Sequence, residues 1–131
     1  MDFMTWYSQL SKPGWTPPPW AIGLIWQILY PIILVSFGFV FYQAARGRVP
    51  WRVTVPLIIN LIANVLFMPI FARLHSLPLA LADILVVWAT IVWTMLVIWR
   101  RYPLVALAQV PYLVWVSIAT VLQICITFWN R

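Results

Sequence analysis

Residues 20–43 read WAIGLIWQILYPIILVSFGFVFYQ, and this stretch decides the fold because it contains no charged side chain. An α-helix needs about 20 such residues to cross the hydrocarbon core of a bilayer. Three further apolar stretches follow, at 53–72, 77–99 and 104–129, and Asp83 is the one charged residue in them. The chain is 65% hydrophobic and 8% charged, so residues 20–131 leave no room for a separate water-soluble domain. Short connections predict an all-α integral membrane protein, an antiparallel bundle of four transmembrane helices.

The positive charges are unevenly distributed along the chain. The formal net charge is +6, and five of the arginines fall in two short loops: Arg46, Arg48, Arg52, Arg100 and Arg101. The positive-inside rule predicts that these loops are cytoplasmic and that both termini lie on the other side. A continuous basic track is absent from the sequence, which argues against a nucleic-acid partner. A short chain without a targeting extension favours a bacterial inner membrane.

Residues 1–19 precede the first apolar stretch and combine tryptophans with prolines. Pro17–Pro19 predict an extended segment that ends where the first helix begins. The segment is either an interfacial anchor with its indoles at headgroup depth or a rigid lid over a cavity between the helices. Prolines also occur inside the spans: Pro31 predicts a kink in the first, and Pro111 lies about two turns into a continuous fourth.

A few polar residues lie inside the spans, where an unpaired polar group is costly. Gln27, Asn64, Asp83 and Gln123 each lie about 10 Å from the non-cytoplasmic end of their helices at the α-helical rise, which predicts one polar layer. The second span carries Asn60, Asn64, Phe67 and Phe71 on one stripe, and four tryptophans lie at or above this level: Trp15, Trp20, Trp26 and Trp129. Aromatic faces around polar tips suit a flat apolar ligand with polar edges. Hydrogen bonding between the helices, without any ligand, is an equally simple explanation for these polar residues.

The sequence offers little for catalysis. Its candidate reactive side chains are two acidic residues, His75 and Cys125. Their spacing matches no familiar acid–base or nucleophilic site, and they are too few for a metal cluster. The chain is therefore interpreted as a binding protein, not an enzyme, with no required cofactor and no metal.

Several motifs resemble one known family. The run KPGWTPPPW at 12–20, followed by WQILY at 26–30, is similar to the signature of the translocator protein (TspO/MBR) family, the tryptophan-rich sensory proteins or peripheral-type benzodiazepine receptors. Three further matches follow in order: Asn64 with PIF at 69–71, ALAD at 80–83, and PYLVW at 111–115 with ATVL at 119–122. Together they cover nearly the whole chain.

The resemblance implies a membrane protein that binds porphyrins beneath a loop rich in proline and tryptophan. Carried over by position, it implies pocket roles for Trp15, Trp20, Trp26, Asn64 and Trp115, with Asp83 supporting the bundle or the cavity rim. The chain departs from the family pattern at Phe67, Ala72 and Gln123. Because its first residues align with the loop before the family's second helix, the resemblance also implies that the first of the family's five helices is missing.

Two functions follow from these observations. The first is a binding protein for a porphyrin, another tetrapyrrole or a similar flat pigment or lipid, with the missing wall supplied by a second copy in a homodimer or by membrane lipid. The second is an accessory subunit that docks onto a larger membrane complex, where a helix of another subunit replaces that wall and the pocket is vestigial.

Overall fold

The computed structural model describes residues 5, 8–73 and 77–130, and this part of the chain is helical without strands. Its elements run α2 (Pro19–Ala45), η1 (Trp51–Thr54), α3 (Val55–Met68), η2 (Pro69–Arg73), α4 (Leu77–Ile98), α5 (Pro103–Ala108) and α6 (Val110–Trp129). Four segments are long and apolar enough to cross a membrane: 20–45, 51–71, 77–98 and 103–129. The predicted all-α bundle of four spans is therefore confirmed, with bounds close to those expected.

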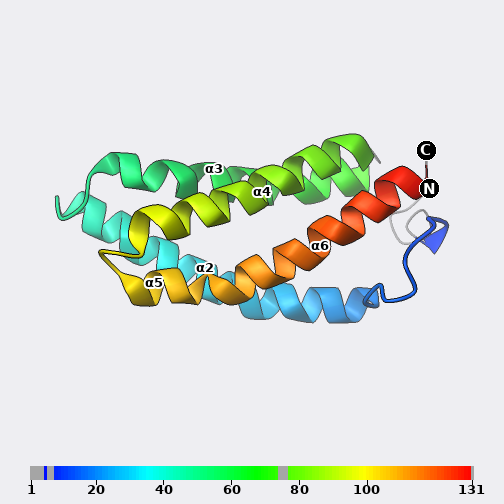
Figure 1. Ribbon diagram of the computed structural model, residues 1–131, viewed down its shortest axis with the longest axis horizontal. Helices are drawn as coiled ribbons and strands as arrows, with labels where there is room; N and C mark the ends of the chain where they lie inside the picture. Colours follow the sequence, from blue (N-terminus) through cyan, green and yellow to red (C-terminus); the bar gives the residue numbers. More distant parts are fainter. Residues whose placement is uncertain (1–4, 6–7, 74–76, 131) are drawn as a thin grey trace.

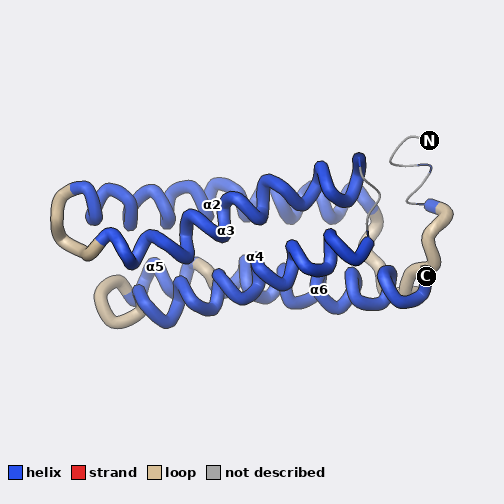
Figure 2. The backbone as a smooth tube through the Cα atoms, turned by 90° about the horizontal axis from the view of Figure 1, so that it is seen from above, coloured by secondary structure: helices blue, strands red, loops and turns tan. Residues whose placement is uncertain are grey.

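The four spans run up and down in one elongated bundle (Figure 1). The loop after α2 and the turn after α4 lie at one end, and both chain termini lie at the other. The tightest backbone packing joins α3 to α4 and α4 to α6, whereas α2 approaches mainly η1, α5 and α6. Figure 2 shows the same bundle from above, with the loop after α2 and the turn after α4 at one end.

The ends of α2 follow from local backbone chemistry. Pro18 is extended at φ −66° and ψ 155°, as the proline run predicts, and α2 begins at the next residue. At the other end Gly47 takes a φ of 74°, a conformation that side chains with a Cβ adopt rarely. The Arg48 N–H donates to the Gln43 carbonyl at 2.9 Å, and the Gly47 N–H donates to the Ala44 carbonyl at 3.0 Å. These bonds satisfy carbonyls that the helix end leaves open.

The fourth span differs from the prediction of one continuous helix. It is divided at Gln109 into the short α5 and the long α6. Pro111 explains the break, because proline has no N–H to donate and its ring clashes with the carbonyl of the preceding turn. Proline is tolerated in a first helical turn, which is where α6 places it. The break leaves the Gln109 carbonyl to accept from the Leu113 N–H at 2.8 Å.

Side chains from all four spans form the central core. On α2 the buried positions recur every three or four residues, so one face of the helix turns inward. The fully buried members with the largest side chains are Ile33, Phe37, Val40, Leu57, Ile91, Ile98, Tyr112 and Val116. A second, smaller core near the termini contains Phe71, Leu77, Ala80, Leu122 and Ile126, with Leu10 packed against it.

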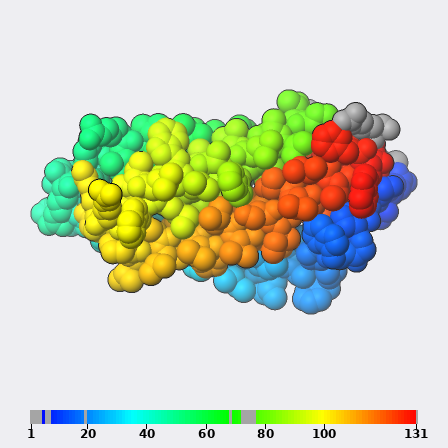
Figure 3. All heavy atoms as spheres, viewed as in Figure 1, coloured from blue at the N-terminus to red at the C-terminus, as the bar shows by residue number. Residues whose placement is uncertain are grey.

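The segment before α2 is fastened to the end of α6. The Ser11 N–H donates to Asn130 Oδ1 at 2.8 Å, and Asn130 Nδ2 donates back to the Ser11 carbonyl at 3.0 Å. Figure 3 shows the N-terminal segment and the end of α6 lying together at one end of the molecule. Residues 1–4 and 6–7 of the predicted lid, together with His75 and Arg131, lie outside the described residues. The role of the segment as a lid or an anchor stays a prediction.

Candidate ligand-binding site

Asn60 is the innermost polar side chain of the candidate site. It lies on α3 with no exposed surface, and its Nδ2 donates to the Val87 carbonyl at 3.2 Å and to Thr90 Oγ1 at 3.0 Å on α4. Thr90 Oγ1 in turn donates to the Val86 carbonyl at 2.8 Å. Both donor positions of Asn60 are thus used, which fixes its amide with the oxygen turned away from α4.

That oxygen is paired with Tyr112 of α6. The Tyr112 hydroxyl donates to Asn60 Oδ1 at 2.9 Å and accepts from Asn64 Nδ2 at 2.8 Å. The outermost link is weaker, since the Tyr30 hydroxyl of α2 donates to Asn64 Oδ1 at 3.5 Å, the limit of a hydrogen bond. A single chain of donors therefore runs from Tyr30 through Asn64, Tyr112 and Asn60 to Thr90, and it connects all four spans.

Trp26 covers the outer part of this chain of hydrogen bonds. Its ring stacks on Tyr30 with centroids 5.3 Å apart and an interplanar angle of 27°. It also meets Tyr112 edge to face at 6.3 Å and 72°. Both geometries are favourable for aromatic pairs. Trp26 and Asn64 are half-buried and Tyr30 is 46% exposed, so the outer end of the hydrogen-bonded chain reaches the surface of the bundle.

Three more of the predicted residues lie along the helices that form the site. Phe67 is half-buried on α3, one turn beyond Asn64, and stacks on Phe71 at 5.5 Å. Trp115 is buried on α6, one turn beyond Tyr112, and its indole nitrogen has no partner among the described residues. Asp83 on α4 also holds a buried carboxylate oxygen, Oδ2, without a partner in that part of the chain. These two atoms are buried polar groups that the described residues leave open for bonding.

The predicted polar layer is divided in the structure. Gln123 is buried, but its Nε2 donates to Thr127 Oγ1 at 3.1 Å and to the Leu77 carbonyl at 3.5 Å, at the end of the bundle near the termini. Gln27 is exposed on the outer surface of α2. Trp15, before α2, and Trp20, in the first turn of α2, are exposed as well. Of the four residues at that depth, Asn64 is the one that enters the hydrogen-bonded chain.

Sequence reasoning missed the residues that join the amides. Tyr112, Tyr30 and Thr90 were not among the candidates, because tyrosine and threonine do not stand out in an apolar span as asparagine does. A signal was present nonetheless: Tyr30 lies four residues after Trp26, on one face of a helix. Tyrosine buried in a membrane bundle needs a partner for its hydroxyl, and that need points to the asparagines.

The described side chains of the site offer aromatic stacking and hydrogen bonding. Aromatic faces flank a directional set of hydroxyl and amide groups, which suits a planar ligand with a few polar atoms at its edge. Among the residues that the structure describes, histidine, cysteine and acidic side chains form no group able to hold a metal ion.

Comparison with known proteins gives one consistent result. A profile of the TspO/MBR family matches residues 1–129. The translocator protein of Homo sapiens is 31% identical over 126 residues, which is 94% of this chain and 73% of that protein. The tryptophan-rich sensory protein of Cereibacter sphaeroides is 30% identical over 96% of this chain and 78% of its own length. Protein CrtK of Rhodobacter capsulatus is 30% identical over 90% of this chain and 74% of its own length.

Proposed function

Because the chain belongs to the TspO/MBR family and is an integral membrane protein, we propose that it binds a porphyrin or related tetrapyrrole at the Trp26–Asn64–Tyr112 site. The observation that carries this proposal is the packing of Trp26 on Tyr30 and Tyr112, whose hydroxyls meet the Asn64 amide. A tetrapyrrole is flat and apolar with carboxylates at its edge, so it matches an aromatic face bordered by donors.

Tyr30 and Asn64 are the groups suited to meet the ligand edge. The hydrogen bond between them is long at 3.5 Å and lies on the open side of the site. Exchanging it for a bond to a ligand carboxylate therefore costs little, and a bond to a charged acceptor is stronger than one between neutral groups. Trp26 supplies the stacking surface. The buried Trp115 indole and Asp83 belong to the walls of the same bundle, and no chemical step is assigned to them.

The test is the affinity of the detergent-solubilised protein for protoporphyrin, followed by quenching of tryptophan fluorescence. The variant Trp26→Ala/Asn64→Ala loses one stacking surface and one hydrogen-bonding group, so we expect a dissociation constant raised about tenfold or more. Trp99→Ala is the matched control, because it removes an exposed indole just beyond α4 at the opposite end of the bundle. Equal affinity in wild type and the double variant would exclude this site.

A second candidate function is favoured by the outer face of α2. Gln27 is exposed there beside large apolar side chains such as Leu24 and Ile28. An amide facing hydrocarbon without a partner is costly, which supports a protein neighbour on this face, either a second copy or a helix of another subunit. In that case the protein acts as an accessory subunit of a larger complex.

Native mass spectrometry after extraction in mild detergent separates these arrangements. A homodimer carrying an adduct of tetrapyrrole mass supports the binding protein, and an assembly with a different polypeptide supports the accessory subunit. A Gln27→Leu variant that keeps the same assembly would remove the argument from the exposed amide.

We also propose the membrane in which the protein lies and the side of it that the termini face. A bacterial inner membrane with both termini outside the cytoplasm agrees with five arginines at one bundle end and the termini at the other. A periplasm-dependent reporter fused after Arg131 checks this, since an inactive reporter means the opposite orientation.

A further inference from the structure

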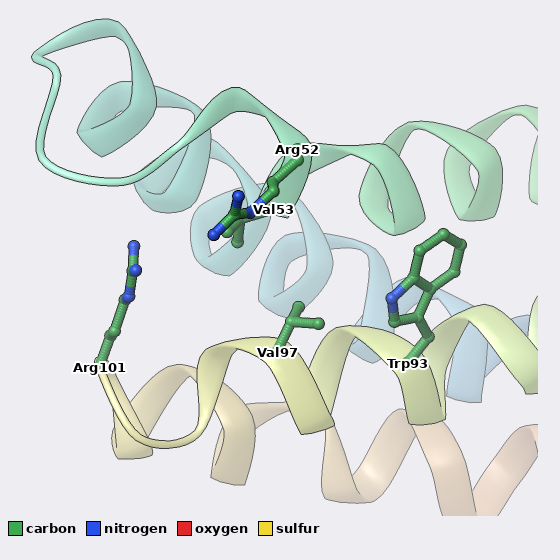
Figure 4. Close-up of a pocket in the computed structure, with 5 residues that line it drawn as sticks. All are labelled: Arg52, Val53, Trp93, Val97 and Arg101. Atoms are coloured by element: carbon green, nitrogen blue, oxygen red, sulfur yellow. The ribbon is translucent and has the colours of Figure 1, made fainter.

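A groove between η1 and α4 lies at the arginine-rich end of the bundle. It has a volume of about 350 Å³ and is lined by Arg52, Val53, Trp93, Val97 and Arg101, and we call it the arginine groove. It is separate from the Trp26 site. Figure 4 shows the two arginines at the loop end of the groove, with Val97 and then Trp93 following along α4.

The groove is amphipathic along its length. Trp93, Val97 and Arg101 follow at intervals of four residues, so they lie on one side of α4 and its following turn. At 1.5 Å per residue, Trp93 lies about 12 Å from the level of Arg101 along the helix axis. One end of the groove is therefore cationic, and the rest is a strip of valine and indole.

The two arginines of the groove have no counterion among the residues that the structure describes. Asp83 is the only acid within the described residues, and the 15 positions that separate it from the end of α4 at Ile98 correspond to about 22 Å. Other arginines at this end do have neighbours: Arg48 donates to Gln43 Oε1 at 3.0 Å, and Arg46 lies 6.0 Å from the Tyr42 ring centroid. The guanidinium groups of Arg52 and Arg101 make no hydrogen bond to a side chain or carbonyl of the described part.

We propose that the arginine groove binds an anionic phospholipid, with the headgroup phosphate between Arg52 and Arg101 and an acyl chain along Val97 and Trp93. Charge complementarity selects this occupant, because guanidinium groups at the end of membrane-spanning helices meet the phosphates of the adjoining leaflet. The apolar strip selects a lipid over a free anion, since inorganic phosphate would leave Val97 and the Trp93 indole uncovered. Basic pockets between transmembrane helices are a recurrent form of lipid-headgroup site.

The test compares lipid retention by the detergent-solubilised protein in native mass spectrometry, with phosphatidylglycerol and phosphatidylcholine as the added lipids. Each arginine near a membrane surface contributes about a fivefold change in affinity, so Arg52→Gln/Arg101→Gln should weaken binding of the first phosphatidylglycerol by roughly 25-fold. The matched control is Arg46→Gln/Arg100→Gln, which removes the same charge from the same two loops outside the groove. We expect the control to keep most of the affinity.

Two further measurements separate lipid from free phosphate and from net charge. A phosphatidylglycerol with brominated acyl chains should quench the fluorescence of wild type more than that of Trp93→Phe, because the chain lies against this indole. Inorganic phosphate should neither protect the protein against heat nor displace the lipid at matched concentration. The proposal is overturned if both double variants lose affinity equally, if phosphatidylcholine binds as well as phosphatidylglycerol, or if phosphate alone gives the full effect.

Discussion

Removing the hydroxyl of Tyr112 tests whether the hydrogen-bonded chain holds the four spans together. Tyr112 is fully buried, and its hydroxyl makes one bond to Asn60 and one to Asn64, at 2.9 and 2.8 Å. The substitution Tyr112→Phe keeps the ring and its edge contact with Trp26. It leaves Asn60 Oδ1 without its donor and Asn64 Nδ2 without its acceptor.

The expected loss of stability follows from these two bonds. Interhelical hydrogen bonds in membrane proteins contribute about 0.6 kcal/mol each on average, which gives about 1.2 kcal/mol for the pair. A buried polar atom left unpaired costs about 1 to 3 kcal/mol, and Asn60 Oδ1 is such an atom because Asn60 has no exposed surface. Asn64 is half-buried and can turn toward the surface opening, so its loss is the smaller one. We expect the free energy of unfolding to fall by about 2 kcal/mol.

The assay is reversible unfolding in mixed micelles with increasing denaturing detergent, followed by circular dichroism. Tyr42→Phe is the control, because Tyr42 is exposed and its hydroxyl bonds to no described residue. In a double-mutant cycle, Tyr112→Phe and Asn60→Leu should lose less together than the sum of the single losses, since each removes the same bond. A Tyr112→Phe change no larger than that of Tyr42→Phe would refute the role of the chain in stability.

Two predictions concern other polar contacts. Asn130→Ala removes both hydrogen bonds to Ser11, so the Ser11 amide should exchange with deuterium about fivefold faster or more. The amides in the middle of α6 should keep their exchange rates. An unchanged Ser11 rate would mean that other contacts hold the N-terminal segment in place. Gln109 is buried and its Nε2 donates to Ser36 Oγ at 2.8 Å, joining the break before α6 to α2. Ser36→Ala alone should therefore lower the free energy of unfolding by about 1 kcal/mol, measured in the same detergent titration. Adding Gln109→Leu should lower it little further. Strictly additive losses would show that the two side chains act independently.

The sequence predicts the spans well because hydropathy is a local property of the chain. Each apolar stretch is long enough to read without knowledge of its neighbours, and the helix bounds follow to within a few residues. The break at Gln109 was missed because Pro111 was placed two turns inside one continuous helix. Whether proline kinks a helix or begins a new one depends on packing against the neighbouring helices, which the sequence of one span does not give. At this break the Gln109 side chain donates to Ser36 Oγ of α2.

The candidate site could be predicted only in part, because depth along a helix does not give the direction in which a side chain faces. Gln27 and Trp26 are adjacent in sequence but differ by about 100° around α2, so one is exposed while the other covers Tyr112. Gln123 lies on an inward face, yet it pairs with Thr127 and the start of α4. Asn60 and Asn64 were identified because they share a stripe of the helix with aromatic residues. Such a stripe indicates which way the side chains face, whereas depth along the helix does not.

The gradient of burial along the hydrogen-bonded chain makes a structural role compatible with the proposed ligand binding. At the inner end Asn60 is fully buried, and its amide makes three hydrogen bonds of 3.2 Å or less. At the outer end Tyr30 is 46% exposed and its bond to Asn64 is 3.5 Å long. A ligand that takes over the Tyr30 hydroxyl replaces the weakest link and leaves the inner bonds intact. Substitutions at Asn60 should therefore lower stability more than affinity, and a Tyr30→Phe change should lower affinity while the bundle keeps its stability.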